Sequence, residues 1–437
     1  MPMQTVSTIR SRSRGAHGSD KPSRSRTRTT KRSSHQEHRT MSDLLGGGST
    51  IPTAHNAAEG GATLARPGGS GLSHGVARNA NELRNVTVDE QHVTPTASAA
   101  QVSAVFVQEI NMPAMCQVVY AVDEHWTERD FKQFKFGGKL EFSDLALGGT
   151  AQGAALPVTY ISGMTFEARP ESGGTSLLTV VAFDKLHWLR FGAHTTPFVN
   201  QTDKQIFESV VSLVEGVTLS AVDMPDNAYP YVLQDNETDY DFLMRRCEEG
   251  NYECMVKTEK SIEKLIVRPS IQGKSPGELA LVYRQDIEAI SLDLRVPTVG
   301  SPVTSWGYDV TTGKMGEELK GYCDKDDYRN PMTGRTAGFQ ASQSFASTVP
   351  MTVRRPDLRD PGALNYAAQA ARTLRQNVFL EGTATLRDIN LQTTAGVNVA
   401  LTGVNAFVDG WYYIVKSTHE RDRQGDRTVL GLRRSGI

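Results

Sequence analysis

Short runs of alternating apolar and polar residues, separated by turn residues, dominate the chain from about Val102 onward. Alternation with a period of two predicts strands that bury one face, and the Gly, Pro and Ser residues between the runs predict tight turns. In the first half the runs are VSAVFVQEI, CQVVYAV, LPVTYISGMTFEA and SLLTVVAFDKLHWL. In the second half they are KLIVRP, LALVYR, ISLDLRV, VTSWGYDV, EGTATL, GVNVALTG, GWYYIVKSTHE and RTVLGLRR. The segment FKQFKFGGKLEF is predicted to be a hairpin around Gly137 and Gly138.

Two segments with helical periodicity interrupt these strands. Between residues 200 and 216, Thr202 offers an N-cap and Gly216 a stop. The apolar residues that recur along one face of this segment are Ile206, Val210, Val211 and Val214. Residues 361–379, rich in Ala, Leu and Arg, form the longest helical candidate. Strands and helices do not alternate regularly, so we predict a mainly β fold of the sandwich or barrel type with a few helices.

The acid-rich stretch YVLQDNETDYDFLMRRCEEGNYECMVK, residues 231–257, raises the question of a metal or catalytic site. A calcium loop that starts at Asp235 needs Gly at its sixth position and Glu at its twelfth. Tyr240 and Arg246 stand there instead, so this type of metal site is excluded.

A capped helix explains the same acids. Thr238 is expected to cap it, Asp241 to complete a capping box, and Asp239 to complement the helix dipole. Gly250 is expected to end the helix, and the residues at packing positions are Phe242, Leu243, Arg246 and Cys247. The acids therefore have a predicted structural role, and the stretch does not require an enzyme.

The first hundred residues differ from the rest of the chain. Within residues 1–40, ten Lys and Arg face only Asp20 and Glu37, although the 437-residue chain has a net charge of -2. This arm has too few apolar residues to build a core, so we interpret it as a disordered extension; contact with nucleic acid is the alternative. Residues 41–100 continue as a Gly/Ala/Ser-rich linker, in which Met41 is an alternative start.

Composition also bears on membranes and metals. No run approaches the ~20 apolar residues of a membrane span, and the start lacks the apolar core of a signal peptide. The four cysteines form no CxxC pair and have no His at ligand spacing, so we expect buried free thiols and no zinc. They are Cys116, Cys247, Cys254 and Cys323. We predict no cofactor and no small-molecule substrate.

Three catalytic patterns fit poorly. Gly273-Lys274-Ser275 lacks the first glycine of a phosphate loop, because Arg268 occupies that position. His187 is better explained as a packed histidine at a strand end, and His419 has no nucleophile motif beside it. A glycan or cell-wall hydrolase would need two carboxylates that face one cleft, and the sequence alone pairs none.

The stretch QDNETDYDFLMRRCEEGNY resembles the signature Q-x-x-E-T/S-D-x-x-F-L-x-R-x-x-E-x-x-G of phage late control gene D proteins. It is also similar to the hub part of type VI valine-glycine-repeat (VgrG) spike proteins and to hubs of extracellular contractile injection systems. The matching residues are Gln234, Glu237, Thr238, Asp239, Phe242, Leu243, Arg245 or Arg246, and Gly250. Three further blocks resemble the family in the same order: one with Asp184 and His187, the strand VTSWGYDV, and a terminal hairpin with Gly410, Tyr412 and His419.

This resemblance covers about residues 101–437 and implies two tail-tube-like β-barrels, residues 101–222 and 301–437, with an α+β insertion at 223–300. It implies a non-enzymatic homotrimeric baseplate hub that joins a hexameric inner tube to a trimeric spike. The implied partners are a separate spike protein, an inner tube or tube-initiator protein, other baseplate proteins, and a tape-measure protein or cargo. Assembly in the bacterial cytoplasm would precede incorporation into a virion tail or contractile particle. A tail-tip hydrolase and a nucleic-acid-binding protein remain the alternatives.

Overall fold

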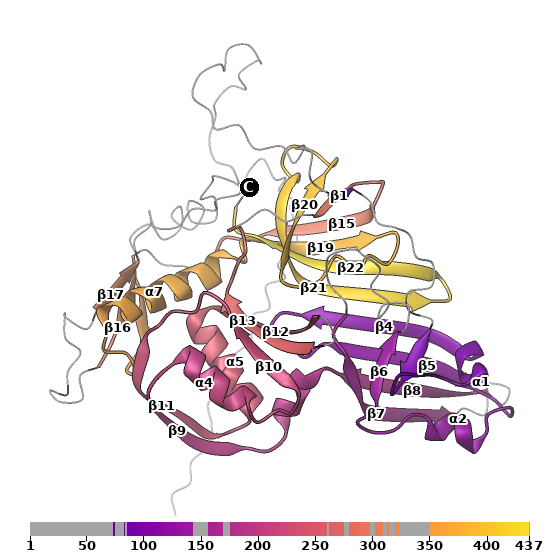
Figure 1. Ribbon diagram of the computed structural model, residues 1–437. Helices are drawn as coiled ribbons and strands as arrows, with labels where there is room; N and C mark the ends of the chain where they lie inside the picture. Colours follow the sequence, from indigo (N-terminus) through magenta and orange to yellow (C-terminus); the bar gives the residue numbers. More distant parts are fainter. Residues whose placement is uncertain are drawn as a thin grey trace, which may run out of the picture. The chain divides into compact units, whose positions relative to one another are not determined.

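The computed structural model describes most of the chain after residue 84. The described residues are 73–74, 83, 85–142, 156–168, 175–259, 262–274, 279–297, 302–308, 313, 320–323 and 350–436. Within them the protein is mainly β with a few short helices, so the predicted fold class is confirmed (Figure 1). The basic arm at residues 1–40 lies outside the described residues.

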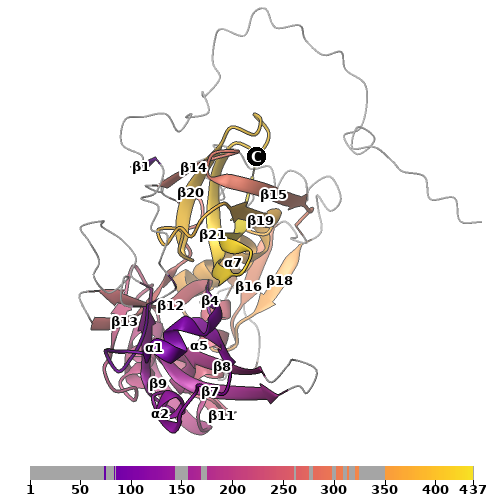
Figure 2. The ribbon, with the colours of Figure 1, turned by 90° about the vertical axis from the view of Figure 1, so that its right-hand side faces the viewer.

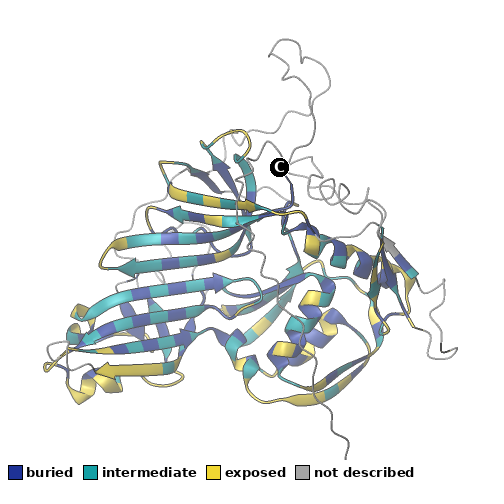
Figure 3. Ribbon diagram, turned by 180° about the vertical axis from the view of Figure 1, so that it is seen from behind, coloured by how far each residue is buried: buried dark blue, intermediate teal, exposed yellow. Residues whose placement is uncertain are grey.

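The first sheet region is built from N-terminal strands in the order β4–β5–β8–β7–β6–β2–β3. Their bounds are β2 Val86–Val88, β3 Gln91–His92, β4 Gln101–Glu109, β5 Met115–Val122, β6 Lys139–Phe142, β7 Thr159–Ala168 and β8 Ser176–Phe183. Strands β4 and β5 alternate buried and half-buried residues, as the predicted period of two requires. Figure 3 shows this alternation as dark blue and teal bands along the strands.

The folded part begins earlier than the expected start near Val102. Leu83, Val86 and Val88 belong to the core of the first sheet region, and β2 pairs with β6. Helix α1 (Pro95–Ala99), capped by Thr94, contributes Ala97 to the same core. Short segments of this kind carry little periodicity of their own, and they become structured by completing a sheet and a core formed by later residues.

The predicted hairpin around Gly137 and Gly138 is wrong in its first half. Helix α2 (Glu128–Lys132) occupies part of that segment, and only β6 follows the two glycines as a strand. The reason is local, because Thr127 and Asp130 form a capping box that starts a helix.

The second sheet region is built from C-terminal strands in the order β14–β20–β21–β22–β19–β15. Their bounds are β14 Leu279–Val282, β15 Ile287–Leu294, β19 Leu380–Leu386, β20 Val397–Thr402, β21 Gly410–Asp422 and β22 Gly425–Arg434; the two-residue β1 (Ser73–His74) pairs with β14. A bridge between Tyr283 and Ile287 joins the chain after β14 to the start of β15. This bridge lies within the short connection from β14 to β15, and the strands of this region share a core of their own.

Among the described strands, one pair joins the two regions. β21 runs antiparallel to β4, with His419 opposite Phe106, so the described strands of both regions form one 14-stranded sheet. In Figure 2 the yellow C-terminal strands lie on one side of this junction and the indigo strands on the other.

A third core lies around three helices. Helix α4 (Asp203–Val211) has the predicted cap, Thr202, with Gln205 completing a capping box. Helix α5 (Asp239–Gly250) and helix α7 (Pro361–Gln376) pack on the same core. The strands of this part are β9 His194–Thr202, β10 Val217–Ala221, β11 Ala228–Glu237, β12 Tyr252–Glu259 and β13 Ile262–Pro269, and a 3₁₀ helix η3 spans Lys185–Arg190.

Helix α7 lies where a helix was predicted but ends three residues early, at Gln376. The amide of Phe379 bonds to the Gln376 carbonyl, so residues 377–379 form a turn that leads into β19 at Leu380. Strands β16 Val303–Trp306, β17 Lys320–Cys323 and β18 Met351–Arg354 form a small sheet beside α7. β16 pairs in parallel with β18 and antiparallel with β17.

Candidate interaction groove

The acid-rich stretch forms the helix that the sequence predicts. Thr238 Oγ1 accepts a hydrogen bond from the Asp241 amide at 3.0 Å, and α5 ends at Gly250. A Cβ at Gly250 would lie 2.2 Å from the Tyr252 ring, so close packing requires this glycine. The left-handed residue that follows is Asn251, with φ 51°.

Asp239 does more than complement the helix dipole. The carboxylate is only 6 % exposed, and its Oδ1 accepts a hydrogen bond from Gln234 Nε2 at 2.8 Å. The Nδ1 atom of His194 lies 3.1 Å from the same oxygen. His194 starts β9 and pairs with Glu237 of β11. The contact between His194 and Asp239 spans 45 positions in the sequence, so no local pattern could indicate it.

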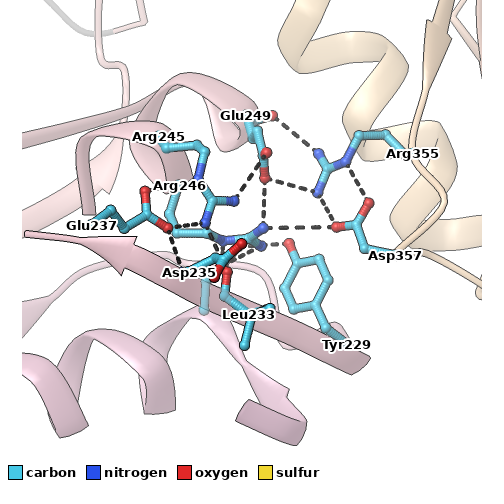
Figure 4. A network of polar contacts seen from close by, with 10 residues as sticks. Tyr229, Leu233, Asp235, Glu237, Arg245, Arg246, Glu249, Arg355 and Asp357 are labelled. Carbon is cyan, nitrogen blue, oxygen red and sulfur yellow. Dashed lines mark hydrogen bonds and ion pairs between the residues drawn. The ribbon is translucent and has the colours of Figure 1, made fainter. Parts of the chain in front are cut away.

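Arg246 is the centre of a buried ionic network, shown in Figure 4. Its Nε and Nη2 donate to Asp203 Oδ1 at 2.9 and 2.6 Å, and its Nη1 donates to Glu249 at 2.5 Å. The hydroxyls of Tyr229 and Tyr252 donate to the other Asp203 oxygen at 2.6 and 2.9 Å. Burial alone would lower the pKa of the guanidinium, but Asp203 and the other acidic neighbours raise it above its ordinary value.

The same network reaches the chain before α7. Arg355 pairs with Asp357 at 2.7 Å and with Glu249 at 3.4 Å, and Asp357 lies 3.7 Å from Arg246. Helices α4 and α5 are thereby tied to a segment more than 100 residues later. Within the acid-rich stretch, Glu249 pairs with the buried Arg246 and with Arg355, which is a structural contact.

The block with Asp184 and His187 forms a turn rather than the predicted strand end. Asp184 caps η3, and its carboxylate accepts hydrogen bonds from the amides of Leu186 and Ala114 at 3.0 and 2.9 Å. Burial raises the pKa of Asp184 to about 7, and these amide bonds oppose that shift. The His187 ring stacks on Phe183, with ring centroids 4.5 Å apart, and burial lowers its pKa.

These two sequence blocks meet at one surface groove of about 720 Å³. His187 and Asp239 both line it, although 52 positions separate them in the sequence. The other lining residues are Phe136, Gly137, Tyr160, Ile161, Ser162, Trp188, Leu189, Phe191, His194, Leu213, Val214 and Glu215. Four large apolar side chains of this groove are exposed: Phe136, Trp188, Phe191 and Leu213. We call this feature the aromatic groove.

An ion pair supports one wall of the aromatic groove. The buried Lys185 ammonium lies 2.8 Å from Glu263, which also accepts a hydrogen bond from the Tyr160 hydroxyl at 2.7 Å. The same ammonium lies 5.3 Å from the Tyr160 ring centroid and 5.5 Å from that of Trp188. The Lys185 ammonium therefore stabilises the positions of the Tyr160 and Trp188 rings.

The terminal motif residues lie in the second sheet region and do not join the aromatic groove. A Cβ at Gly410 would lie 2.8 Å from Arg434 Nη2, and the Tyr412 hydroxyl donates to the Val408 carbonyl at 2.7 Å. His419 is fully buried, 3.0 Å from Thr428 Oγ1 and 3.3 Å from Ser417 Oγ. Burial lowers the pKa of His419 to about 4. These contacts are those of packed structural residues.

Residues 163–422 match the sequence family described as the Alg8 N-terminal domain. This segment makes up more than half of the chain. The chain belongs to the Alg8 N-terminal domain family. The family segment contains α5, its ionic network and most of the aromatic groove lining. No curated protein matches the sequence. The late control gene D resemblance therefore stays a prediction.

Similar solved structures include two tail proteins and a component of a type VI secretion system. The 43 kDa tail protein of prophage MuSo2 from Shewanella oneidensis has a TM-score of 0.56 and 12% identity, over 80% of this chain and 97% of that one. The tail protein from Neisseria meningitidis MC58 has a TM-score of 0.54 and 14% identity, over 81% and 96%. The E. coli c3393 protein, described as a component of the type VI secretion system, has a TM-score of 0.50 and 13% identity, over 79% and 76%. At these identities the likeness shows a shared fold.

The described residues contain neither a metal-binding cluster nor a membrane-spanning helix. Within these ranges no group of three or more His, Cys, Asp or Glu side chains is arranged to hold a metal ion. No helix in the described part is long and apolar enough to cross a membrane. Gly273 and Lys274 lie in a turn after β13, and the described thiols are free and buried, as predicted: Cys116, Cys247 and Cys254. Cys323 is described only in its backbone.

Proposed function

We propose that this protein is a structural baseplate hub of a contractile phage tail or of a tail-derived injection machine. One observation carries the proposal: the fold is shared with two tail proteins over about 80% of this chain and nearly all of theirs. A third protein of this fold is described as a type VI secretion component with similarity to T4 tail proteins gp27 and gp5. The hub would act as a homotrimer between the inner tube and the spike.

Exposed sheet edges support a ring assembly. Among the described residues, β7 pairs with β6 only at Thr159 and Tyr160, while its distal half is exposed. An unpaired strand edge is a template for another chain, and closed symmetric rings cover such edges. The proposed neighbours are a spike protein, the tube or its initiator, other baseplate proteins, and a tape-measure protein or cargo. The first sheet region, β2 to β8, and the second, β14, β15 and β19 to β22, are proposed as the two tube-like parts, in place of the predicted ranges 101–222 and 301–437.

The proposed hub is not an enzyme, and a tail-tip glycan hydrolase is the competing function. The aromatic groove is lined by two carboxylates, Asp239 and Glu215, which is the minimum that such an enzyme requires. However, Asp239 is held by Gln234 and His194. Release of sugars from cell-wall polymer by the purified protein, abolished in Asp239→Asn and Glu215→Gln, would favour the hydrolase.

The oligomeric state tests the hub. We expect the full-length chain, co-expressed with the spike protein of the same particle, to have a light-scattering mass that corresponds to three copies. We expect electron micrographs of intact particles to locate it between tube and spike after its assembly in the bacterial cytoplasm. A chain that stays monomeric with the spike present would contradict the proposal.

A further inference from the structure

Asp239 is a buried carboxylate with one oxygen unused. Both hydrogen bonds that it accepts, from Gln234 and His194, converge on Oδ1. Among the described residues, none donates to Oδ2. A carboxylate can accept on both oxygens, and Oδ2 is not one of the fully buried atoms that lack a partner, so it is open to the solvent side. Because Asp239 lines the aromatic groove, a donor that enters from solvent can reach it.

The walls around this carboxylate are suited to a flat cation. Trp188 lies in the last turn of η3, Phe191 directly follows that helix, and both are exposed and line the aromatic groove. Aromatic faces attract cations, Arg more often than Lys. The same region already contains such a contact, because the Arg190 guanidinium lies 4.3 Å from the Tyr240 ring centroid.

We infer that the aromatic groove binds an arginine side chain of a partner protein. The guanidinium would donate to Asp239 Oδ2, and its plane would lie against Trp188 or Phe191. Arg fits better than Lys, because guanidinium is planar, weakly hydrated and able to stack while it donates. The groove volume of about 720 Å³ leaves room for apolar residues beside the arginine, against Phe136 and Leu213. This inference does not depend on the proposed ring, since it concerns one chain and one peptide.

A matched pair of peptides tests it on the full-length protein at neutral pH. The probe is acetyl-Gly-Leu-Arg-Leu-Gly-amide, and its control replaces Arg with citrulline, which has nearly the same shape but no charge. Calorimetric titration should show saturable binding of the Arg peptide, at least about tenfold tighter than that of the citrulline peptide, because charge-assisted hydrogen bonds are the stronger kind. Equal affinity of the two peptides, or no binding of either at millimolar concentration, would overturn the inference.

A pair of variants then shows which carboxylate binds the guanidinium. Asp239→Asn should remove the preference for Arg over citrulline, whereas Glu215→Gln, a carboxylate in the same groove, should keep it. Trp188→Ala should weaken both peptides. Circular dichroism checks that each variant is folded. A folded Asp239→Asn protein that retains the full preference would also overturn the inference, and the peptide comparison on the unaltered protein holds even if that variant does not fold.

Discussion

At the residue scale, the protein separates two adjacent arginines of one motif into different roles. Arg246 is 2 % exposed and bonded to Asp203 and Glu249, whereas the side chain of Arg245 is 39 % exposed and pairs with Glu237. In the predicted resemblance to late control gene D proteins, either arginine fits the signature position. Burial makes Arg246 the more important of the two for stability, because removing one partner from a buried ion pair leaves an uncompensated charge.

This difference predicts unequal costs of truncation. Arg246→Ala should lower the free energy of unfolding by roughly 3–5 kcal/mol, because Asp203 would stay buried without its main partner. Arg245→Ala, the matched control, should cost about 0–1 kcal/mol, as is usual for exposed ion pairs. Urea unfolding measures both, provided that the slope with denaturant is unchanged. Equal costs would contradict the buried network.

At the element scale, β21 decides how the two sheet regions are joined. It pairs with β20 and β22 in its own region and with β4 of the other. His419 stands in the part of β21 that pairs with both β4 and β22, fully buried between hydroxyl groups. A neutral imidazole fits there, and a charged one does not.

Acid should therefore lower the free energy of unfolding of the protein. The pKa of His419 is near 6.5 in the unfolded chain and about 4 in the folded protein. Between these values the unfolded chain binds more protons, so stability is lost as pH falls from about 6.5 towards 4, by up to roughly 3 kcal/mol. Asp184 has a raised pKa and shifts stability in the opposite direction over a similar range.

Comparison with His419→Gln isolates the imidazole, because Asp184 titrates in both proteins. The difference in unfolding free energy between the two proteins, measured by denaturant titration at several pH values, should change between pH 6.5 and 4 and be constant above. A difference that does not vary with pH would show that His419 is not the titrating group.

At the scale of the whole molecule, the core of the first sheet region contains residues from a segment whose composition predicts a linker. Leu83, Val86, Val88 and Ala97 are buried in it. They lie within residues 1–100, which carry no strand or helix pattern strong enough to stand alone. The described fold therefore depends on a segment that composition assigns to a linker.

Truncation at two places tests this dependence. A chain that starts at residue 73 should keep a cooperative unfolding transition, whereas one that starts at residue 101 should be less stable by several kcal/mol, roughly 1.5–3 for each large apolar side chain lost from the core. Thermal unfolding followed by circular dichroism compares them. Equal stability of the two chains would show that β2 and α1 contribute little to the core.

The sequence by itself determined the strand-rich fold class, most later strands, α4, α7 and the capped helix α5. These features depend on periodicity and capping among residues close in the chain, which the sequence records directly. Only the tertiary structure decided which motif residues work together. His194 reaches Asp239 across a strand pair, Asp203 reaches Arg246 between two helices, and His187 and Asp239 line the same aromatic groove. Contacts between distant positions, and the burial that sets their energies, leave no local pattern in the chain.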